Sequence, residues 1–335
     1  MSRVGGSFAW PNLVSRAGLL HMGSLWQRLG LPVVPGYGPA VALFQRVDAS
    51  DWALLGPETA GARGHSWLAT PETEEAWLFK PVVVHGNRRQ GEDWAEKVVA
   101  EIAQVMGVPH AQIELASRRG SLGCLSRDLK PRGWEIQPGS ALLSGLIDGY
   151  ESHQKGRRGH SLANVRTVLS GIGPPPQAKG TVSESAFDFF VGYLVLDALV
   201  ANRDRHDDNW SVLRPDSGDD CLCGSYDHAS SLGFNLLDHE RVRRLRDGTL
   251  PNWAARGTAV KFEHDPNAGP ASLVEHARRA LTMCSARAAA HWLTMASAVT
   301  REVVAQVFAS LPDVSDPVTN FGTALVIHNR ERLLP

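Results

Sequence analysis

The sequence predicts an α+β fold made of a small lobe with an antiparallel sheet and one helix, followed by a mostly helical lobe. Strand-like segments joined by turn-rich loops, with one amphipathic helix among them, fill the chain between residues 52 and 127. Apolar residues at helical spacing dominate after residue 187. With 335 residues, 43% of them hydrophobic, the chain can bury one large core or two modest ones.

The first 44 residues alternate glycine, proline and short apolar pieces without a sustained period. We expect a poorly ordered extension there, because termini without a packing face are rarely fixed. An ordered extension, a flexible leader or an overlong gene start is the alternative. The expected domains are the extension (1–44), the small lobe (45–129) and the helical lobe (130–335).

The small lobe should consist of five strands and one helix. The expected strands are residues 52–55, 61–68, 76–80, 110–115 and 123–127. The helix should cover residues 91–106, where Trp94, Val98 and Ile102 recur at helical spacing and Gly107 ends the pattern.

The helical lobe should begin with a loop-rich stretch, residues 130–180, containing short helical patterns at 142–150 and 161–169. A core helix at 187–200 leads into a short strand at 210–213 and a returning strand at 222–226. Residues 247–270 should be irregular. Further helices are expected at 238–246, 272–283, 286–299, 301–311 and 316–332, and Ser272 with Glu275 forms a capping box.

Whole-chain properties narrow the function classes. The formal net charge is -1, which implies no bulk attraction to nucleic acid or membrane surfaces. The four cysteines show no metal-type C-x-x-C pair, so reduced thiols are the plain interpretation. No segment has the apolar length that spans a bilayer, and the N-terminus lacks an export signal. We therefore expect a cytoplasmic protein.

Two polar clusters about twenty residues apart follow the core helix and the hairpin. Asp204, His206 and Asn209 lie in the loop after the helix, and Asp227 lies at the end of the returning strand. In a phosphotransferase, one Asp orients and deprotonates a hydroxyl, while an Asn and a second Asp hold Mg²⁺ on the phosphates. Either cluster alone is typical of a solvated turn with capping residues. Both clusters, at the two ends of one hairpin, favour phosphoryl transfer.

Further candidates for nucleotide binding lie in the small lobe. Gly61, Gly64 and Ser66 form a loop in which backbone amides can approach phosphates closely. Lys80 ends an apolar strand, the position from which a kinase lysine reaches the phosphates. The alternatives are an ordinary hairpin loop and a lysine on a solvated strand edge.

The segment Asn202-Arg-Asp-Arg-His-Asp-Asp-Asn-Trp210, followed by Tyr226-Asp-His-Ala-Ser-Ser-Leu-Gly233, resembles the catalytic core of HipA-like serine/threonine kinases. These bacterial kinases have a two-lobed protein-kinase-like fold and a distant likeness to phosphatidylinositol kinases. The resemblance runs from about Asp48 to the C-terminus and is most specific in the catalytic segment. It implies that Asp204 is the catalytic Asp, Asn209 a Mg²⁺ ligand and Asp227 the counterpart of the kinase D-F-G aspartate.

The resemblance also implies that ATP binds between the lobes and that an acid on the small-lobe helix pairs with Lys80. Glu96 fits that position better than Glu101, which becomes surface charge. Backbone groups of Ser126, Arg127 and Asp128, in a hinge spanning residues 126–129, would bind the adenine. His206 is a second candidate catalytic residue, and a structural role in the loop is the alternative for it.

The expected function is therefore ATP- and Mg²⁺-dependent phosphorylation of a Ser or Thr hydroxyl on a protein, with an antitoxin-like protein as a possible partner. One alternative is a catalytically inactive kinase-fold regulatory or toxin–antitoxin-type binding module. Another is a kinase acting on a small molecule or lipid, although the near-neutral charge and the lack of an amphipathic membrane helix disfavour the lipid version. No direct nucleic-acid or membrane binding is expected.

Overall fold

The computed structural model describes residues 43–58, 64–86, 88–178, 182, 183 and 185–335. Residues 43–335 form one structural unit. The expectation for the N-terminal extension therefore lies outside the described residues, apart from its last two. Phe44 belongs to the folded unit, because its N–H donates to the Ser310 carbonyl at 2.7 Å and the Lys97 ammonium lies 4.6 Å from its ring centroid.

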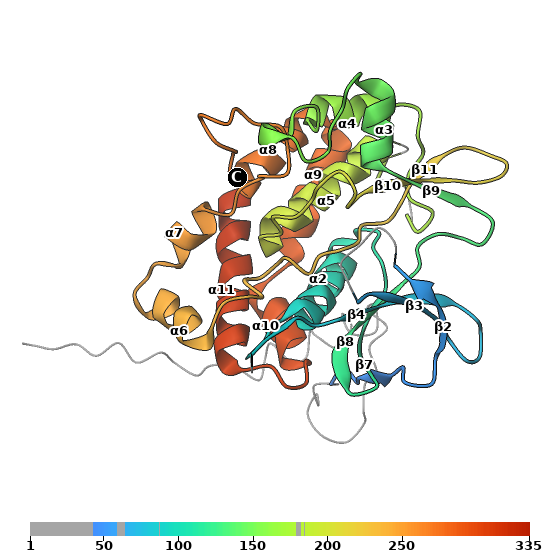
Figure 1. The fold of residues 1–335 in the computed structure, drawn as a ribbon. Helices are drawn as coiled ribbons and strands as arrows, with labels where there is room; N and C mark the ends of the chain where they lie inside the picture. The colour runs from blue at the N-terminus through green and yellow to red at the C-terminus, as the bar shows by residue number, and fades with distance from the viewer. Residues whose placement is uncertain (1–42, 59–63, 87, 179–181, 184) are drawn as a thin grey trace, which may run out of the picture. The chain divides into compact units, whose positions relative to one another are not determined.

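A six-stranded sheet forms the small lobe (Figure 1). Its strands, in spatial order, are β1 (Val47–Asp48), β7 (Ile113–Arg118), β8 (Ser121–Arg127), β4 (Ala76–Pro81), β3 (Ser66–Ala69) and β2 (Ala53–Pro57). Neighbouring strands are antiparallel except β1 and β7. The register pairs Lys80 with Cys124, which places the lysine on a central strand. The five predicted strands appear as β2, β3, β4, β7 and β8, with bounds that differ by a few residues from the expected ones, and β1 was not predicted. The hairpin of β5 (Val84–His85) and β6 (Arg88–Arg89) was not predicted.

The large lobe is mostly helical, as predicted. Its described helices are α3 (Gly139–Leu146), α4 (Leu162–Val168), α5 (Ala186–Val200), α6 (Asp238–Arg246), α7 (Leu250–Ala255), α8 (Leu273–Met283), α9 (Ala286–Ala298), α10 (Arg301–Ala309) and α11 (Asp316–Leu333). The expectation of irregular chain at 247–270 was wrong for α7. Pro251 lies in its first turn, where backbone N–H groups have no partner within the helix, so the N–H that proline lacks is not missed. The predicted capping box is confirmed, since Ser272 and Glu275 exchange backbone and side-chain hydrogen bonds.

Helix α5 is the central helix of the large lobe. All of its residues are buried, so it has no solvent-facing stripe. Trp292 of α9 packs directly on Gly192, and its indole N–H donates to the Asp188 carbonyl at 2.8 Å. These contacts fix the first half of α5 against α9, and the loop that carries Asp204 follows the buried C-terminal end of the helix.

A second sheet lies beside this loop, with strand order β11 (Cys221–Leu222), β10 (Ser211–Arg214) and β9 (Glu135–Pro138). Strand β9 falls in the stretch expected to be loop-rich, and that expectation was wrong there. The predicted strand at 222–226 was too long. After Cys223, whose N–H still donates to the Ser211 carbonyl, the chain leaves the hairpin. The Ser225 N–H donates to the Pro109 carbonyl, and the Ser225 carbonyl accepts from the Ala111 N–H.

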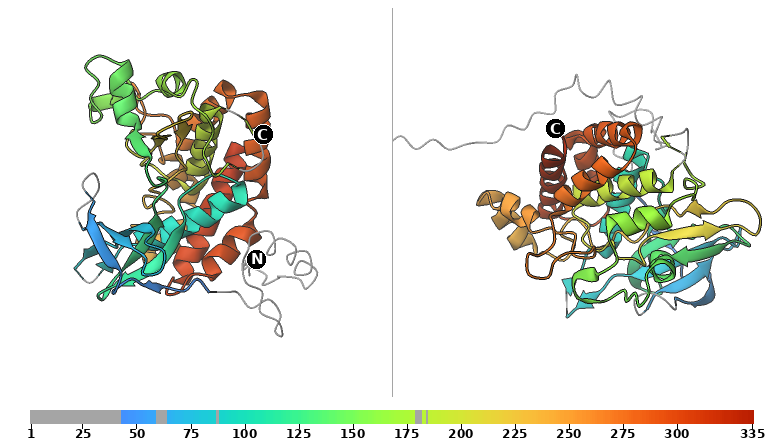
Figure 2. Two further views of the ribbon diagram at one scale, coloured as in Figure 1. Left: turned by 90° about the vertical axis from the view of Figure 1, so that its right-hand side faces the viewer. Right: turned by 90° about the horizontal axis from the view of Figure 1, so that it is seen from above.

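Helix α2 (Glu92–Met106) joins the two lobes. It contacts β7 and β8 on one side and α5, α9 and α10 on the other (Figures 1 and 2). Its apolar residues belong to the same buried cluster as those of α5, α8, α9, α10 and α11. The largest core is thus shared between the lobes, and α2 is part of it.

All four cysteines are free, as expected. Among the described residues, no helix is both long and apolar enough to cross a membrane.

Candidate active site

The loop after α5 is held by its own side chains. Ala201 adopts a left-handed conformation that ends the helix. Asn202 then donates its side-chain N–H to the Asp197 carboxylate at 2.8 Å, and its side-chain oxygen accepts the Asp204 N–H at 3.1 Å. This Asx-type turn fixes the direction in which Asp204 leaves the helix.

Arg205 joins the loop to the segment that carries Asp227. Its guanidinium, 2% exposed, donates to the Asp197 carboxylate, to the Asn209 carbonyl at 2.7 Å and to the Ser225 hydroxyl at 2.9 Å. Burial by itself would lower the pKa of Arg205, but the ion pair with Asp197 outweighs it and raises that pKa. Removing one partner of such a pair leaves an unpaired buried charge, which destabilises a protein strongly. The loop therefore keeps the geometry in which Arg205 and Asp197 meet.

The carboxylate of Asp204 is about one-third exposed. One oxygen accepts from the Lys261 ammonium at 2.8 Å, and the other lies 3.5 Å from the Ser230 hydroxyl. The carboxylate is therefore held by one cation and remains partly open to a hydroxyl group.

One end of the Asn209 side-chain amide is fixed by a hydrogen bond. Its amide nitrogen donates to the Asp204 carbonyl at 2.7 Å. A carbonyl can only accept, so this bond identifies which end of the amide is nitrogen and leaves the amide oxygen for another partner. That oxygen is a hard ligand of the type Mg²⁺ prefers.

Lys80, Glu96 and Asp227 form one ionic cluster. The Lys80 ammonium donates to Glu96 and to Asp227, each at 2.8 Å. Glu96 is fully buried and also accepts the His228 N–H at 2.9 Å. Burial by itself would lower the pKa of Lys80, but Asp227 and Glu96 outweigh it, so that pKa stands well above its usual value. The contact places Glu96 against Lys80, as expected, and Glu101 pairs with Lys97 instead.

Asp227 has a left-handed backbone with φ of 60°. This conformation is uncommon for a residue other than glycine, and functional residues are found in it more often than others. The Lys80 ammonium lowers the pKa of Asp227 to about 2. Lys80 contacts one carboxylate oxygen, so the second oxygen remains available to a cation.

His206 is neutral and presents one ring N–H. Burial lowers its pKa. Its Nδ1 accepts the Asp208 backbone N–H at 3.2 Å, which puts the ring proton on Nε2. His206, Asp207 and Asp208 bring ligand atoms within 4.8 Å of one another. However, both oxygens of Asp207 already accept hydroxyl groups of Tyr150 and Ser152.

The glycine loop is only partly described. Gly61 lies outside the described residues. Gly64 has φ of 96°, and Ser66 begins β3. The base of the loop is closed by His65 and Glu58, whose side chains are 2.6 Å apart.

Fewer backbone groups of the hinge than expected are free to bind an adenine. Ser126 pairs with strands on both sides of β8. The Arg127 N–H donates to the Gln112 carbonyl and the Asp128 N–H to the Ala76 carbonyl. Among the described residues, no partner accepts the Leu129 N–H, so adenine recognition through an amide donor would move to that residue.

Four residues around the predicted site were not predicted from the sequence. Arg205, His228 and Lys261 contact predicted site residues, and Ser225 contacts Arg205. Arg205 lies inside the recognised motif, and its place between Asp204 and Asn209 was the available signal. Lys261 stands in a stretch without a pattern, which gave no signal.

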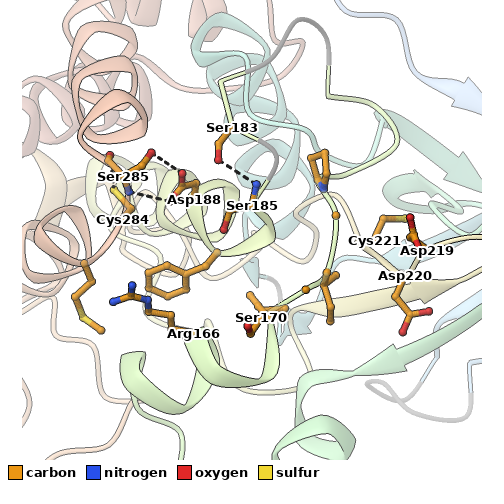
Figure 3. Close-up of a pocket in the computed structure, with 17 residues that line it drawn as sticks. Arg166, Ser170, Ser183, Ser185, Asp188, Asp219, Asp220, Cys221, Cys284 and Ser285 are labelled. Atoms are coloured by element: carbon orange, nitrogen blue, oxygen red, sulfur yellow. Dashed lines mark hydrogen bonds between the residues drawn. The ribbon is translucent and has the colours of Figure 1, made fainter.

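A separate cavity of about 1000 Å³ opens at the N-terminal end of α5 (Figure 3). None of the predicted site residues lines it. Its buried acid, Asp188, is occupied by the N–H and the hydroxyl of Ser285, which hold the start of α9. The cavity is therefore separate from every residue that the sequence assigns to phosphoryl transfer.

No protein-family model matches the chain, and no curated protein matches its sequence. Solved structures do match. The Helicobacter pylori proinflammatory kinase CtkA aligns with a TM-score of 0.65 and 16% identity, covering 86% of this chain and 95% of that one. HipA of Shewanella oneidensis, in a toxin–antitoxin complex with HipB and operator DNA, aligns with a TM-score of 0.53 and 14% identity, covering 93% of this chain and 70% of the matched one. The predicted fold class is confirmed: the chain has the two-lobed kinase fold that CtkA and HipA share.

Proposed function

We propose that this protein is an ATP- and Mg²⁺-dependent phosphotransferase whose acceptor is a Ser or Thr hydroxyl on a protein. The observation that carries the proposal is the Lys80 ammonium joined to Glu96 and Asp227 at 2.8 Å each. The kinase fold supports it, because a strand lysine, a helix glutamate and a metal-binding aspartate recur together in phosphoryl transfer.

The donor set fits Mg²⁺. Asn209 would hold the metal through its amide oxygen, and Asp227 through the carboxylate oxygen that does not contact Lys80. When bound, the metal would neutralise charge on the phosphates. Lys80 binds the phosphates in this proposal, and Glu96 keeps the lysine in place.

Asp204 acts on the acceptor. It accepts the proton of the acceptor hydroxyl, the hydroxyl oxygen forms a bond to the γ-phosphorus, and the bond from that phosphorus to the β,γ-bridging oxygen breaks, so that ADP leaves with the electron pair. The neutral His206 presents its Nε2–H beside Asp204 and can donate to the acceptor or to a phosphate oxygen. The reaction depends on position and charge more than on covalent catalysis.

A regulatory protein partner is part of the proposal. The HipA structure that matches this chain contains HipB and operator DNA. We extend to this chain only the protein partner, because its formal net charge of -1 favours no direct contact with nucleic acid. The four free thiols favour a reducing, cytoplasmic location.

An inactive binding module and a kinase for small molecules or lipids remain the alternatives. All four key side chains, Lys80, Asp204, Asn209 and Asp227, are present and held by hydrogen bonds, which favours a working enzyme. Incubation with labelled ATP and Mg²⁺, followed by mass spectrometry of the protein and of a cell lysate, tests the proposal. Label on Ser or Thr of a protein supports it. Label only on a lipid or small molecule contradicts the acceptor class, and no transfer at all contradicts the function.

Variants then separate the two aspartates. Asp204→Ala should abolish transfer with little change in Mg·ATP affinity, since a group that contacts the acceptor contributes mainly in the transition state. Asp227→Ala should also weaken Mg²⁺-dependent ATP binding in calorimetric titrations. Asp51→Ala, at an exposed aspartate far along the chain from the cluster, is the matched control. Unchanged Mg·ATP binding in Asp227→Ala would remove Asp227 from the metal site.

A further inference from the structure

Lys261 contacts the proposed catalytic carboxylate from a distant part of the chain. It lies between α7 and α8, and its Nζ is 2.8 Å from Asp204 Oδ1. Among the described residues, no other cation contacts Asp204. The lysine side chain is 26% exposed, so part of it is open to solvent beside Asp204.

The backbone of Lys261 is fixed by His160. The Lys261 carbonyl is 2.7 Å from His160 Nδ1, and the next residues continue the attachment. Glu263 N–H donates to the His160 carbonyl at 2.8 Å. Phe262, 4% exposed, stacks on the His160 ring with centroids 4.3 Å apart. Lys261 therefore projects from a rigid base in an otherwise irregular segment.

His160 is also tied to the metal-binding loop. Trp210, which directly follows Asn209, donates its indole N–H to His160 Nε2 at 3.2 Å. An indole N–H only donates and a carbonyl only accepts, so His160 must be neutral with its proton on Nδ1. One buried ring thus sets the distance between the Asn209 end of the loop and the backbone of Lys261.

Two functions are open to a lysine in this position. It could simply pair with Asp204 and hold it still. However, a cation fixed on Oδ1 leaves only Oδ2 for the acceptor hydroxyl. In phosphoryl transfer the hydroxyl on Asp204 meets the γ-phosphoryl group, whose equatorial oxygens carry the transition-state charge. A flexible lysine stem beside Asp204 can turn its ammonium from the carboxylate to those oxygens.

We propose that Lys261 is a catalytic residue that contacts the transferred phosphoryl group, and that His160 is the positioning residue that aims it. The proposal rests on the phosphotransferase function. In the transfer step, Lys261 gains and loses no proton. Its ammonium leaves Asp204 as the acceptor hydroxyl arrives and donates to the γ-oxygens while the bond to the bridging oxygen breaks.

The first test separates binding from transfer. Lys261→Met should lower kcat by about 10²- to 10³-fold, the usual effect of losing one preorganised donor to transition-state charge, while the Kd for Mg·ATP changes little. Lys261→Arg should recover part of kcat. Lys155→Met, which removes the same charge from an exposed lysine, should leave kcat unchanged. Equal kcat in Lys261→Met and the parent overturns the proposal.

The second test asks whether Lys261 acts on the phosphoryl group or only through Asp204. Binding of ADP, Mg²⁺ and aluminium fluoride, which mimics the planar phosphoryl group, is measured in four proteins: the parent, Lys261→Met, Asp204→Ala and the double variant. We expect Lys261→Met to weaken binding equally in the presence and absence of Asp204. A loss that disappears in the Asp204→Ala background would make Lys261 a positioning residue, and the proposal would be wrong.

The role of His160 has its own readout. His160→Gln should lower kcat by about tenfold, with unchanged Mg·ATP affinity, after correction for the fraction of folded protein. Lower stability with unchanged kcat would show that His160 is only part of the core. If the parent transfers phosphate and Lys261→Met does so equally well, only this inference fails. If the parent neither transfers phosphate nor binds ADP with aluminium fluoride, the proposed function fails with it.

Discussion

At the scale of single residues, charge and burial decide which groups can take part in the chemistry. The Lys80 ammonium lowers the pKa of Asp227 to about 2, so this carboxylate is ionised at every pH a cell experiences. His206 and His160 are both neutral near pH 7, because burial lowers the pKa of each ring. The site therefore combines permanent charges with neutral hydrogen-bond donors.

The buried His160 makes stability depend on pH. Burial lowers its pKa from 6.5 to about 4. Below pH 6.5 the histidine of the unfolded chain binds a proton, while the buried His160 of the folded protein stays neutral down to about pH 4. Acidification over this range therefore favours the unfolded state. We therefore predict that the free energy of unfolding falls between pH 6.5 and pH 4, with His160 responsible for about 3 kcal/mol of the loss. His276, whose pKa burial lowers to about 3, acts in the same direction.

Urea unfolding at pH 7, 6, 5 and 4.5 checks this prediction. His160→Gln should be less stable than the parent at pH 7 but should lose less stability on acidification. The exposed His239→Gln variant should follow the parent. If the free energy of unfolding falls equally with pH in His160→Gln and the parent, the prediction is wrong.

At the scale of elements, α2 decides where the acid that pairs with Lys80 can stand. We predict that Glu96→Gln lowers kcat/KM for ATP-dependent transfer by about 10- to 100-fold, because it removes a charged hydrogen bond from a buried lysine. Glu101→Gln on the same helix breaks only the pair with Lys97 and should have little effect on transfer. Equal activity of the two variants would show that the Lys80–Glu96 pair is not needed.

At the contact between α5 and α9, packing and helix propensity predict opposite changes in stability for a substitution of glycine by alanine. Ala is favoured over Gly within a helix by about 1 kcal/mol. A Cβ at position 192, however, would lie 2.6 Å from the Trp292 ring. Gly192→Ala should therefore destabilise the protein by about 1–3 kcal/mol, the usual effect of overpacking.

Gly145 is the matched control for Gly192. It lies in α3 and a Cβ there would meet nothing within 4 Å. Gly145→Ala should be neutral or stabilising by about 0.4–1 kcal/mol. Thermal unfolding of both variants measures the difference, and a Gly192→Ala protein as stable as Gly145→Ala would be inconsistent with the packing described.

Local pattern explains which elements could be predicted. The long periodic helices, α2 and α5, appear within a residue or two of their expected bounds. Strand β9 was missed because Glu135-Ile-Gln-Pro138 is short and polar, and its partner β10 stands more than seventy residues away, as the Val212–Gln137 pairing shows. Contacts formed across such separations leave no period in the sequence.

The same reasoning applies to the site. Asp204, Asn209 and Asp227 were recognised from a motif and a resemblance, and Glu96 from its distance to the end of its helix. The contact of Lys261 with Asp204 depends on how distant segments meet, which neither composition nor spacing encodes. The roles of the predicted residues in nucleotide and metal binding stay predictions.

At the scale of the whole molecule, the folded unit begins two residues earlier than the expected boundary. A chain beginning at Gln45 should still transfer phosphate, as the lack of candidate ligands before it implies. It should be less stable, by about 1–2 kcal/mol, than a chain beginning at Leu43, because it lacks the Phe44 hydrogen bond to Ser310 and the ring packed under Lys97. Chemical unfolding of the two chains measures this, and identical stabilities would place the boundary at residue 45.

The shared core has a consequence for chemical inhibition. Many protein kinases are controlled through the position of the helix that carries the lysine's acidic partner. Here that helix is α2, which is packed between the sheet and α5, α9 and α10. A compound that gains its binding site by wedging this helix outward would have to open the largest core of the protein. Compounds that leave the helix in place should therefore bind this protein better than compounds designed to displace it.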